Sequence, residues 1–319
     1  MGTFILRRLL WTIVLLASVT ALTFTIFNVL PSADPAALRA GRDPPPELTA
    51  AIRDQLNLDD PLLVRLVSYL GDLFLHFDFG TSVVNDTPVR PLILDALPNT
   101  LMLVLGAAVV WLVCGVAIGT ISAVRRGTVL DRVAMTSALV AISAPVYWLG
   151  LVALYVFSSD LGILRIFPAA GTYDAADGIF TSISSLFLPW IVLAAAFSAI
   201  YARLLRSNLL EVMSEDYVRT ARAKGLTERR VVLRHGLRSA ITPIVTVLGL
   251  DLGILVGGAI LTESVFGIPG IGQLSYDAIQ RNDIDVVQGA MLFLALGVCL
   301  MSLLVDILYA VLDPRVRSW

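Results

Sequence analysis

Residues 100–123 read TLMLVLGAAVVWLVCGVAIGTISA, a run of 24 residues without one charged side chain. A helix needs about 17–25 mostly apolar residues to cross the hydrocarbon layer of a bilayer. Five further stretches meet this requirement, at about residues 9–30, 133–157, 186–202, 241–262 and 287–312. Within the six stretches, charge is confined to Asp251 in the fifth and Asp306 in the sixth. The sequence therefore predicts an all-α integral membrane protein with six transmembrane helices.

The composition points the same way. Hydrophobic residues make up 57% of the 319 residues and charged residues 15%, whereas a soluble domain has about 45–50% apolar and about 25% charged residues. Lipid must therefore cover much of the surface, which excludes an ordinary soluble enzyme and a disordered chain. The two cysteines, Cys114 and Cys299, and the two histidines, His76 and His235, offer neither a disulfide framework nor a metal site.

The basic residues predict the orientation in the membrane. If both termini are cytoplasmic, 16 of the 23 Arg and Lys residues fall on the cytoplasmic side, and 17 of the 25 acidic residues fall outside. Because Arg and Lys bias short loops toward the cytoplasm, we expect the N- and C-termini to be cytoplasmic.

Three parts follow along the chain. Residues 1–30 form an N-terminal segment with the first transmembrane helix, residues 31–98 an extended external helical segment, and residues 99–319 a five-helix membrane core. The external segment has a Pro-rich entry at 44–46 and amphipathic stretches at 47–56 and 61–74, the second with apolar residues at near-helical spacing. Two interpretations of it stay open: a lid lying on the membrane surface, and a docking platform for an external partner.

The most informative connection is the cytoplasmic loop at residues 203–240. Within it, residues 215–226 read EDYVRTARAKGL, with acids first, a basic face, and no helix breaker before Gly225. This order predicts a short helix that a glycine ends. Basic segments beside a membrane also bind anionic lipid headgroups without further function, and charge alone would favour that alternative.

Short motifs spread almost from end to end of the chain carry a family resemblance. They are LRRLL at 6–10, DFG at 78–80, LPNT at 97–100, DYVRTARAKGL at 216–226, HGLR at 235–238, GG at 257–258, ESVFGIPG at 263–270 and DPR at 313–315. With them, the chain closely resembles the membrane-spanning permease subunits of ABC importers in the dipeptide/oligopeptide/nickel family. The run at 216–226 is the specific one.

The resemblance implies a pore-forming subunit of an ATP-driven importer of di- and oligopeptides in the bacterial cytoplasmic (inner) membrane. It implies a second homologous permease, two ATP-binding subunits that hold ATP and Mg, and an external substrate-binding protein as partners, besides membrane lipid. This chain would hold no cofactor, metal or catalytic residue. Its only lysine, Lys224, follows Ala223 and precedes Gly225, so it cannot form a phosphate-binding loop. The basic loop also lacks the stacking aromatics that nucleic-acid binding needs.

In such permeases, a cytoplasmic helix followed by glycine docks in a groove of the ATPase. The resemblance therefore places ATPase coupling at Tyr217, Arg219, Thr220, Ala221, Arg222, Lys224, Gly225 and Leu237. The broader importer signature is Glu-Ala-Ala, three residues and Gly, followed by Ile-x-Leu-Pro. Only Ala221, Gly225 and Leu237 match it here, and Arg219 stands where the signature has glutamate, so the role of that glutamate does not transfer.

A glycine stripe and an acid mark the fifth span. Gly249, Gly253 and Gly257 recur every four residues, and such a stripe lets another backbone approach closely. It would serve either a subunit interface or pore, or packing within the chain. Asp251 beside it should face protein or water, because a carboxylate in hydrocarbon is costly. Contact with the peptide path, a structural hydrogen bond and a protonated form are alternatives for Asp251, while Asp306 is expected to pair with a basic residue.

The outer end of the fifth span carries Glu263 and Phe266, followed by the reversal around Pro269 and Gly270. The resemblance implies an external gate loop here, and the proline and glycines favour a sharp, non-helical turn. Importers of nickel chelates, haem or glutathione share the architecture and stay open as alternatives. An ATP-independent secondary transporter would carry functional charge or broken helices at mid-membrane, for which only Asp251 is available. A membrane scaffold is a third alternative.

Overall fold

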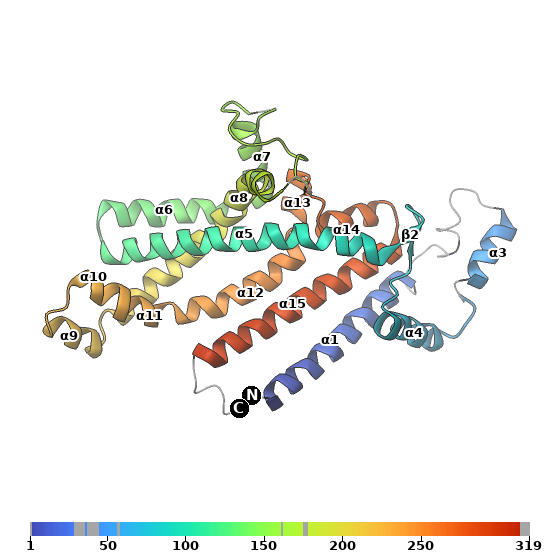
Figure 1. The fold of residues 1–319 in the computed structure, drawn as a ribbon, viewed down its shortest axis with the longest axis horizontal. Coiled ribbons are helices and arrows are strands. Elements are labelled where there is room, and N and C mark those ends of the chain that lie inside the picture. Colours follow the sequence, from blue (N-terminus) through green and yellow to red (C-terminus); the bar gives the residue numbers. More distant parts are fainter. Residues whose placement is uncertain are drawn as a thin grey trace. The chain divides into compact units, whose positions relative to one another are not determined.

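The computed structural model describes residues 2–28, 36, 45–55, 58–160, 162–174 and 178–312. The described chain is almost entirely helical, with one short β-hairpin (Figure 1). It divides into two compact units, one of Met1–Pro98 with Pro269–Cys299 and one of Asn99–Ile268 with Leu300–Trp319. The DPR motif at 313–315 lies outside the described residues, as do residues 29–30 of the N-terminal segment and residues 31–35, 37–44 and 56–57 of the external segment.

The first unit contains the N-terminal and external elements. They are α1 (Gly2–Asn28), α3 (Pro46–Gln55), α4 (Leu62–Gly71), the π-helix η1 (Asp72–His76), strands β1 (Thr81–Ser82) and β2 (Thr87–Pro88), and α14 (Ile271–Gln280). The strands pair antiparallel, with Thr81 opposite Pro88 and Ser82 opposite Thr87. The unit also holds the start of α5 (Val89–Val124) and most of α15 (Ile284–Leu312).

The DFG motif is part of the core of this unit. Phe79 is buried and its ring centroid lies 5.2 Å from that of Phe293. Gly80 has a φ of +79°, and a Cβ there would lie 2.9 Å from the Oδ2 of Asp285. Only glycine satisfies both the left-handed backbone and the close approach. The motif therefore joins the external hairpin to α15.

The second unit contains the remaining helices. They are α6 (Val129–Ser143), α7 (Val146–Phe157), α8 (Ile179–Val212), α9 (Asp216–Ala223), α10 (Glu228–Arg230), η3 (Val231–Gly236), α11 (Leu237–Ala240), α12 (Thr242–Gly258) and α13 (Ile260–Phe266). Its core holds fully buried large side chains, such as Trp111, Tyr201 and Leu205.

Glycines of α5 allow α8 to pack closely against it. A Cβ on Gly115 would lie 2.7 Å from the Cβ of Tyr201, and one on Gly119 would lie 2.7 Å from the carbonyl oxygen of Ala202. Small residues four positions apart permit such an approach between membrane helices.

Among the residues that the structure describes, four helices are long and apolar enough to span a membrane, and up to six spans result if each of two bent pairs counts as one. The helices at residues 6–27, 89–124, 180–212 and 284–304 are the four. The sequence predicts one continuous span at 133–157, but the structure has α6 and α7 there, meeting at 104°. Pro145 explains the break, because a proline lacks the N–H donor and disfavours helical backbone in the residue before it. Ala144 is accordingly extended, with φ −86° and ψ 130°.

Candidate functional site

The cytoplasmic loop folds around a short helix that a glycine ends, as the sequence predicts. Asp216 lies in the first turn of α9, where a carboxylate favours the positive end of the helix dipole. Beyond α9, Gly225 takes a φ of +78°, and its N–H donates to the carbonyl oxygen of Arg222 at 2.9 Å. A Cβ on Gly225 would have no atom of this chain within 4 Å. The glycine thus turns the chain and leaves open space beside the helix end.

The inner face of α9 packs on a small apolar cluster. Val218 and Ala221 are buried there together with Val231 of η3. Val212 and Met213, at the end of α8, pack against the same cluster. The helix is therefore held directly to the end of α8, a long helix that reaches into the membrane core.

The outer face of α9 is exposed and basic. Of the eight residues assigned to coupling, six are exposed, Ala221 is buried and Leu237 is half-buried against the main core; the six are Tyr217, Arg219, Thr220, Arg222, Lys224 and Gly225. The Tyr217 hydroxyl donates to the Ser239 Oγ at 3.0 Å. The structure thus gathers all of these residues except Leu237 around one helix.

An ion pair links the two ends of the turn after α9. The Arg222 guanidinium donates to both carboxylate oxygens of Glu228, at 3.1 and 2.7 Å. These hydrogen bonds hold the pKa of the Glu228 carboxyl below its usual range. Both side chains are about half-exposed, so water screens the pair.

A buried charge cluster lies on the connection between α5 and α6. The Asp131 side chain, 6% exposed, accepts two hydrogen bonds from the Arg206 guanidinium, each at 2.8 Å. It also accepts from the Ser122 hydroxyl and from the Gly127 N–H, the latter at 2.9 Å. We call these four residues the Asp131 clasp. It joins the ends of α5 and α6 to α8.

Sequence reasoning missed the Asp131 clasp. Their charges entered only the prediction of membrane orientation, because a separation of 75 positions gives no local indication that Asp131 and Arg206 pair. One local signal was available: Thr128 begins α6 as its N-cap, and its side chain accepts from the Asp131 N–H. This pattern predicts the helix start but not the partner on α8.

The carboxylate of the fifth span has a partner inside the chain. The hydroxyl of Tyr201, a buried residue of α8, donates to the Asp251 Oδ2 at 2.8 Å. Gly249 and Gly253 are buried on the same helix, α12. This favours the structural alternatives, a hydrogen bond for the acid and packing within the chain for the glycines. The burial of Gly257 lies outside what the structure describes, as do the side-chain contacts of Asp306.

The residues assigned to an external gate fall in both units. In the second, Glu263 is fully buried and its Oε1 accepts from the Thr100 hydroxyl at 2.7 Å. Phe266 is buried, and Gly267 then turns the chain with a φ of +63°. In the first unit, Pro269 precedes Gly270, whose carbonyl begins α14 by accepting from the Leu274 N–H at 2.9 Å. The non-helical turn between α13 and α14 is present as predicted.

The LPNT motif contributes to the same region of the second unit. Besides the hydrogen bond from Thr100, the Asn99 Oδ1 accepts from the Tyr173 hydroxyl at 3.2 Å. Burial raises the pKa of the Tyr173 hydroxyl, which stays a donor. The loop that follows α7 also bonds to α13, because the Gly171 N–H donates to the Phe266 carbonyl at 2.8 Å. The beginning of α5 in this unit is thus tied to the end of α13.

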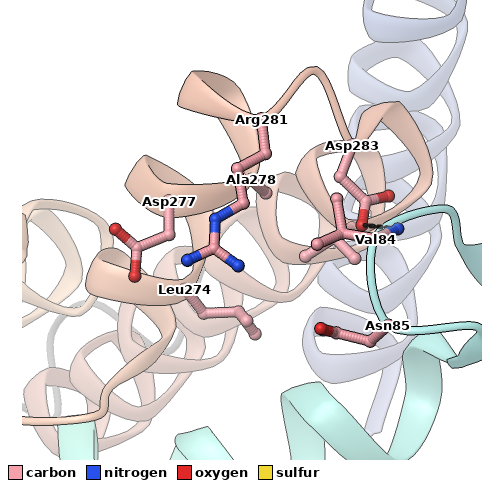
Figure 2. Close-up of a pocket in the computed structure, with 8 residues that line it drawn as sticks. Val84, Asn85, Leu274, Asp277, Ala278, Arg281 and Asp283 are labelled. Atoms are coloured by element: carbon pink, nitrogen blue, oxygen red, sulfur yellow. Dashed lines mark hydrogen bonds between the residues drawn. The ribbon is translucent and has the colours of Figure 1, made fainter. Parts of the chain in front are cut away.

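A small pocket of about 160 Å³ lies in the first unit between the β-hairpin and α14 (Figure 2). Figure 2 shows the Arg281 side chain reaching back across it toward Asp277. The Asp283 carboxylate fixes the hairpin, accepting from the Ser82 hydroxyl at 2.5 Å. Sites for small molecules measure roughly 300–1,000 Å³. The pocket is therefore too small for a peptide and could admit a single side chain.

Apolar helices long enough to cross a bilayer, and a basic loop folded on its own apolar cluster, define a multi-pass membrane protein. The family described as "Binding-protein-dependent transport system inner membrane component" matches residues 115–318. The corresponding N-terminal family, "Binding-prot-dependent transport system membrane comp, N-term", matches residues 1–104. The chain therefore belongs to the inner membrane components of binding-protein-dependent transport systems, as a permease of the ABC importers of the dipeptide/oligopeptide type.

Similar proteins cover the chain almost completely. A putative peptide transport system permease protein of Brucella abortus (strain 2308) is 40% identical over 317 residues, 99% of either chain. A glutathione transport system permease protein of Salmonella choleraesuis is 42% identical over 314 residues, 98% of either chain. The same-named protein of Salmonella paratyphi A is 41% identical over 314 residues, again 98% of either chain.

Proposed function

We propose that this chain forms one half of the translocation pore of an ATP-driven importer of small peptides, and that α9 receives the motion of a partner ATPase. The supporting observation is the two-faced construction of α9. Its inner face is fixed to α8 through Val218 and Ala221, while its outer face is exposed and basic. A helix built this way offers a partner protein an exposed surface to bind. Any displacement of α9 is then passed to α8 through the packed inner face.

The proposed mechanism involves no bond chemistry in this chain. Two ATP-binding subunits hold and hydrolyse ATP with Mg, and a second homologous permease completes the pore. Their closure displaces α9, and α8 moves with it because the apolar cluster joins them. Packed helices switch between discrete arrangements rather than deforming continuously, so the pore exchanges an inward opening for an outward one. Glu263, Phe266, Pro269 and Gly270 belong to the external gate, and an external binding protein delivers the substrate.

A specific observation supports each of two candidate substrates. Similar proteins carry the names of peptide and of glutathione transport permeases, and glutathione is itself a tripeptide. Small peptides in general are the first candidate and glutathione the second.

The test is reconstitution with the proposed partners: a second permease, two ATP-binding subunits and an external binding protein. We expect proteoliposomes with the complete complex to take up a labelled dipeptide only when ATP is supplied to the ATPase side. Uptake that persists without ATP under an ion gradient would contradict the proposal and favour a secondary transporter. Competition by unlabelled glutathione, compared with unlabelled dipeptide, separates the two substrates.

A photo-crosslinking residue placed on α9 tests whether the ATPase subunit contacts this helix. Thr220 lies on the exposed face of α9, and Arg126 is an equally exposed control on the connection between α5 and α6. We expect a crosslinker at position 220, but not at position 126, to capture the ATPase subunit. A complex that crosslinks at neither position, or only at 126, would contradict the assignment of α9.

A further inference from the structure

The external helix α4 and the following η1 carry more apolar surface than the chain covers. Leu73 faces inward, with 2% of its surface exposed. Leu63, Val67 and Leu75 face outward instead, with 73%, 68% and 77% exposed. These three residues, spaced four and eight apart, form one stripe along the helix, which we call the outer apolar stripe.

A polar stripe runs directly beside it. Ser68, Asp72 and His76 are also four residues apart and exposed, and the His76 Nδ1 lies 3.5 Å from the Asp72 Oδ1. The helix therefore has an inward apolar face, an outer apolar stripe and a polar edge. A wide apolar face bordered by polar residues is typical of helices that lie in the plane of a membrane interface.

The position of α4 within its unit indicates the depth at which this helix lies in the membrane. Its Tyr69 ring lies 5.4 Å from the ring of Phe24, and the Arg65 guanidinium lies 5.7 Å from the same ring. Phe24 belongs to the last turns of α1, a helix long and apolar enough to span the membrane from Leu6 to Phe27. Figure 1 shows α4 lying across this end of α1. An element packed there sits at the boundary between hydrocarbon and headgroups.

The end of α1 beside α4 carries exposed apolar side chains of its own. Leu22 and Ile26, near the same end of α1, are exposed at 61% and 43%. Because α1 is long and apolar enough to span a membrane, these side chains mark how far its apolar surface extends toward its C-terminal end. Phe24, whose ring contacts Tyr69, lies two residues from each of them and so on the opposite face of α1, and α4 therefore packs at the level of this apolar surface.

We propose that α4 and η1 form an interfacial helix that inserts Leu63, Val67 and Leu75 into the leaflet where the C-terminal end of α1 emerges. Ser68, Asp72 and His76 then lie among the headgroups. Interfacial helices bury their apolar face about 5–10 Å into the boundary between headgroups and acyl chains. The occupant of this face is lipid, and a docked protein is the competing outcome of the test.

The experiment places one spin label on each stripe. In a Cys114→Ser, Cys299→Ala background, Val67→Cys and Ser68→Cys are labelled in the full chain and embedded in phosphatidylcholine nanodiscs. Collision with oxygen reports on lipid, and collision with a neutral nickel chelate reports on water. Both positions are exposed, so neither label disturbs packing, and position 68 is the matched control one residue away.

We expect the oxygen-to-nickel accessibility ratio to be severalfold higher at position 67 than at position 68, with and without the external binding protein. Equal ratios, or nickel access at position 67, would overturn the proposal because the stripe would then face water. Exclusion of both reagents from position 67 would also overturn it, since a protein surface would then cover the stripe. A Leu63→Cys label must repeat the result of position 67.

Discussion

Gly225→Asn separates a glycine that shapes the chain from a glycine that another protein must approach. Gly225 has a φ of +78°, and a Cβ there would meet no atom of this chain within 4 Å. A side chain at this position therefore clashes with nothing inside the permease. Any loss of function beyond the backbone cost must come from a contact outside the chain.

The backbone cost is small. Left-handed backbone costs an ordinary residue roughly 1–2 kcal/mol, and Asn is among the residues that tolerate it best. A Gly225→Ala variant should lose about 1 kcal/mol of unfolding free energy and Gly225→Asn less. Against a typical stability of about 5–15 kcal/mol, both variants remain folded and inserted in the membrane.

Gly127 is the matched control. It lies on the connection between α5 and α6, has the same φ of +78°, and a Cβ there would also meet no atom within 4 Å. Its part in the Asp131 clasp is its backbone N–H, which a substitution of the side chain keeps. Gly127→Asn and Gly127→Ala should therefore cost the same free energy of unfolding. We expect ATP-dependent uptake by the reconstituted complex to be largely lost in Gly225→Asn and retained in Gly127→Asn, with equal thermal unfolding temperatures.

Two results would refute this reasoning. Uptake at the wild-type rate in a folded Gly225→Asn complex would show that no partner surface approaches the end of α9. Equal loss at both positions would show that left-handed glycines matter only for the fold. Measuring ATP hydrolysis in the same samples adds a third readout. If the contact between the end of α9 and the ATPase subunit is lost, hydrolysis continues without uptake.

Three further predictions concern polar contacts. Asp131→Ala removes the shared acceptor of the Asp131 clasp and should lower the free energy of unfolding in a thermal or denaturant assay by more than removing the exposed carboxylate of Asp216, which should cost less than about 1 kcal/mol. The Glu228 carboxyl has a depressed pKa in the folded chain, so its pairing with Arg222 stabilises the loop above the unfolded-state pKa, and this stabilisation is lost as pH falls through the folded-state pKa; the hydrogen-exchange protection factors of α9, corrected for the intrinsic exchange rate, should fall in acid, and Glu228→Gln should abolish that pH dependence. Thr100→Val removes the donor to a fully buried carboxylate and should cost about 1–3 kcal/mol, with Thr100→Ser close to wild type.

The features that sequence reasoning recovered are local ones. The length of an apolar stretch alone predicts a membrane-spanning helix, because only the hydrocarbon of a bilayer can cover so long an apolar surface. The helix at residues 216–223 and its end at Gly225 follow from acids in the first turn and a glycine after the last. Each of these signals lies within one stretch of chain, so no knowledge of tertiary contacts is needed.

Sequence reasoning missed two kinds of feature. Some depend on partners that are distant in sequence, and one had a local signal that a stronger local signal outweighed. Asp131 and Arg206 meet only because α6 packs beside α8. Glu263 meets Thr100 across 163 positions. The break at Pro145 had a local signal, but the uninterrupted apolar run from 133 to 157 outweighed it. The roles of the coupling and gate residues remain predictions, since they concern proteins outside this chain.

The arrangement of polar contacts along α5 gives this helix a mechanical meaning. Thr100, about a third of the way along α5, bonds to Glu263, and Ser122 belongs to the Asp131 clasp near the end of the helix. The 22 helical steps from Thr100 to Ser122 span about 33 Å at the helical rise of 1.5 Å per residue. Because helix backbone does not stretch, a displacement of α8 that carries Arg206 also moves the far end of α5. The contacts at Glu263 must then break or follow, which in the function proposed above would link the external gate to the cytoplasmic loop.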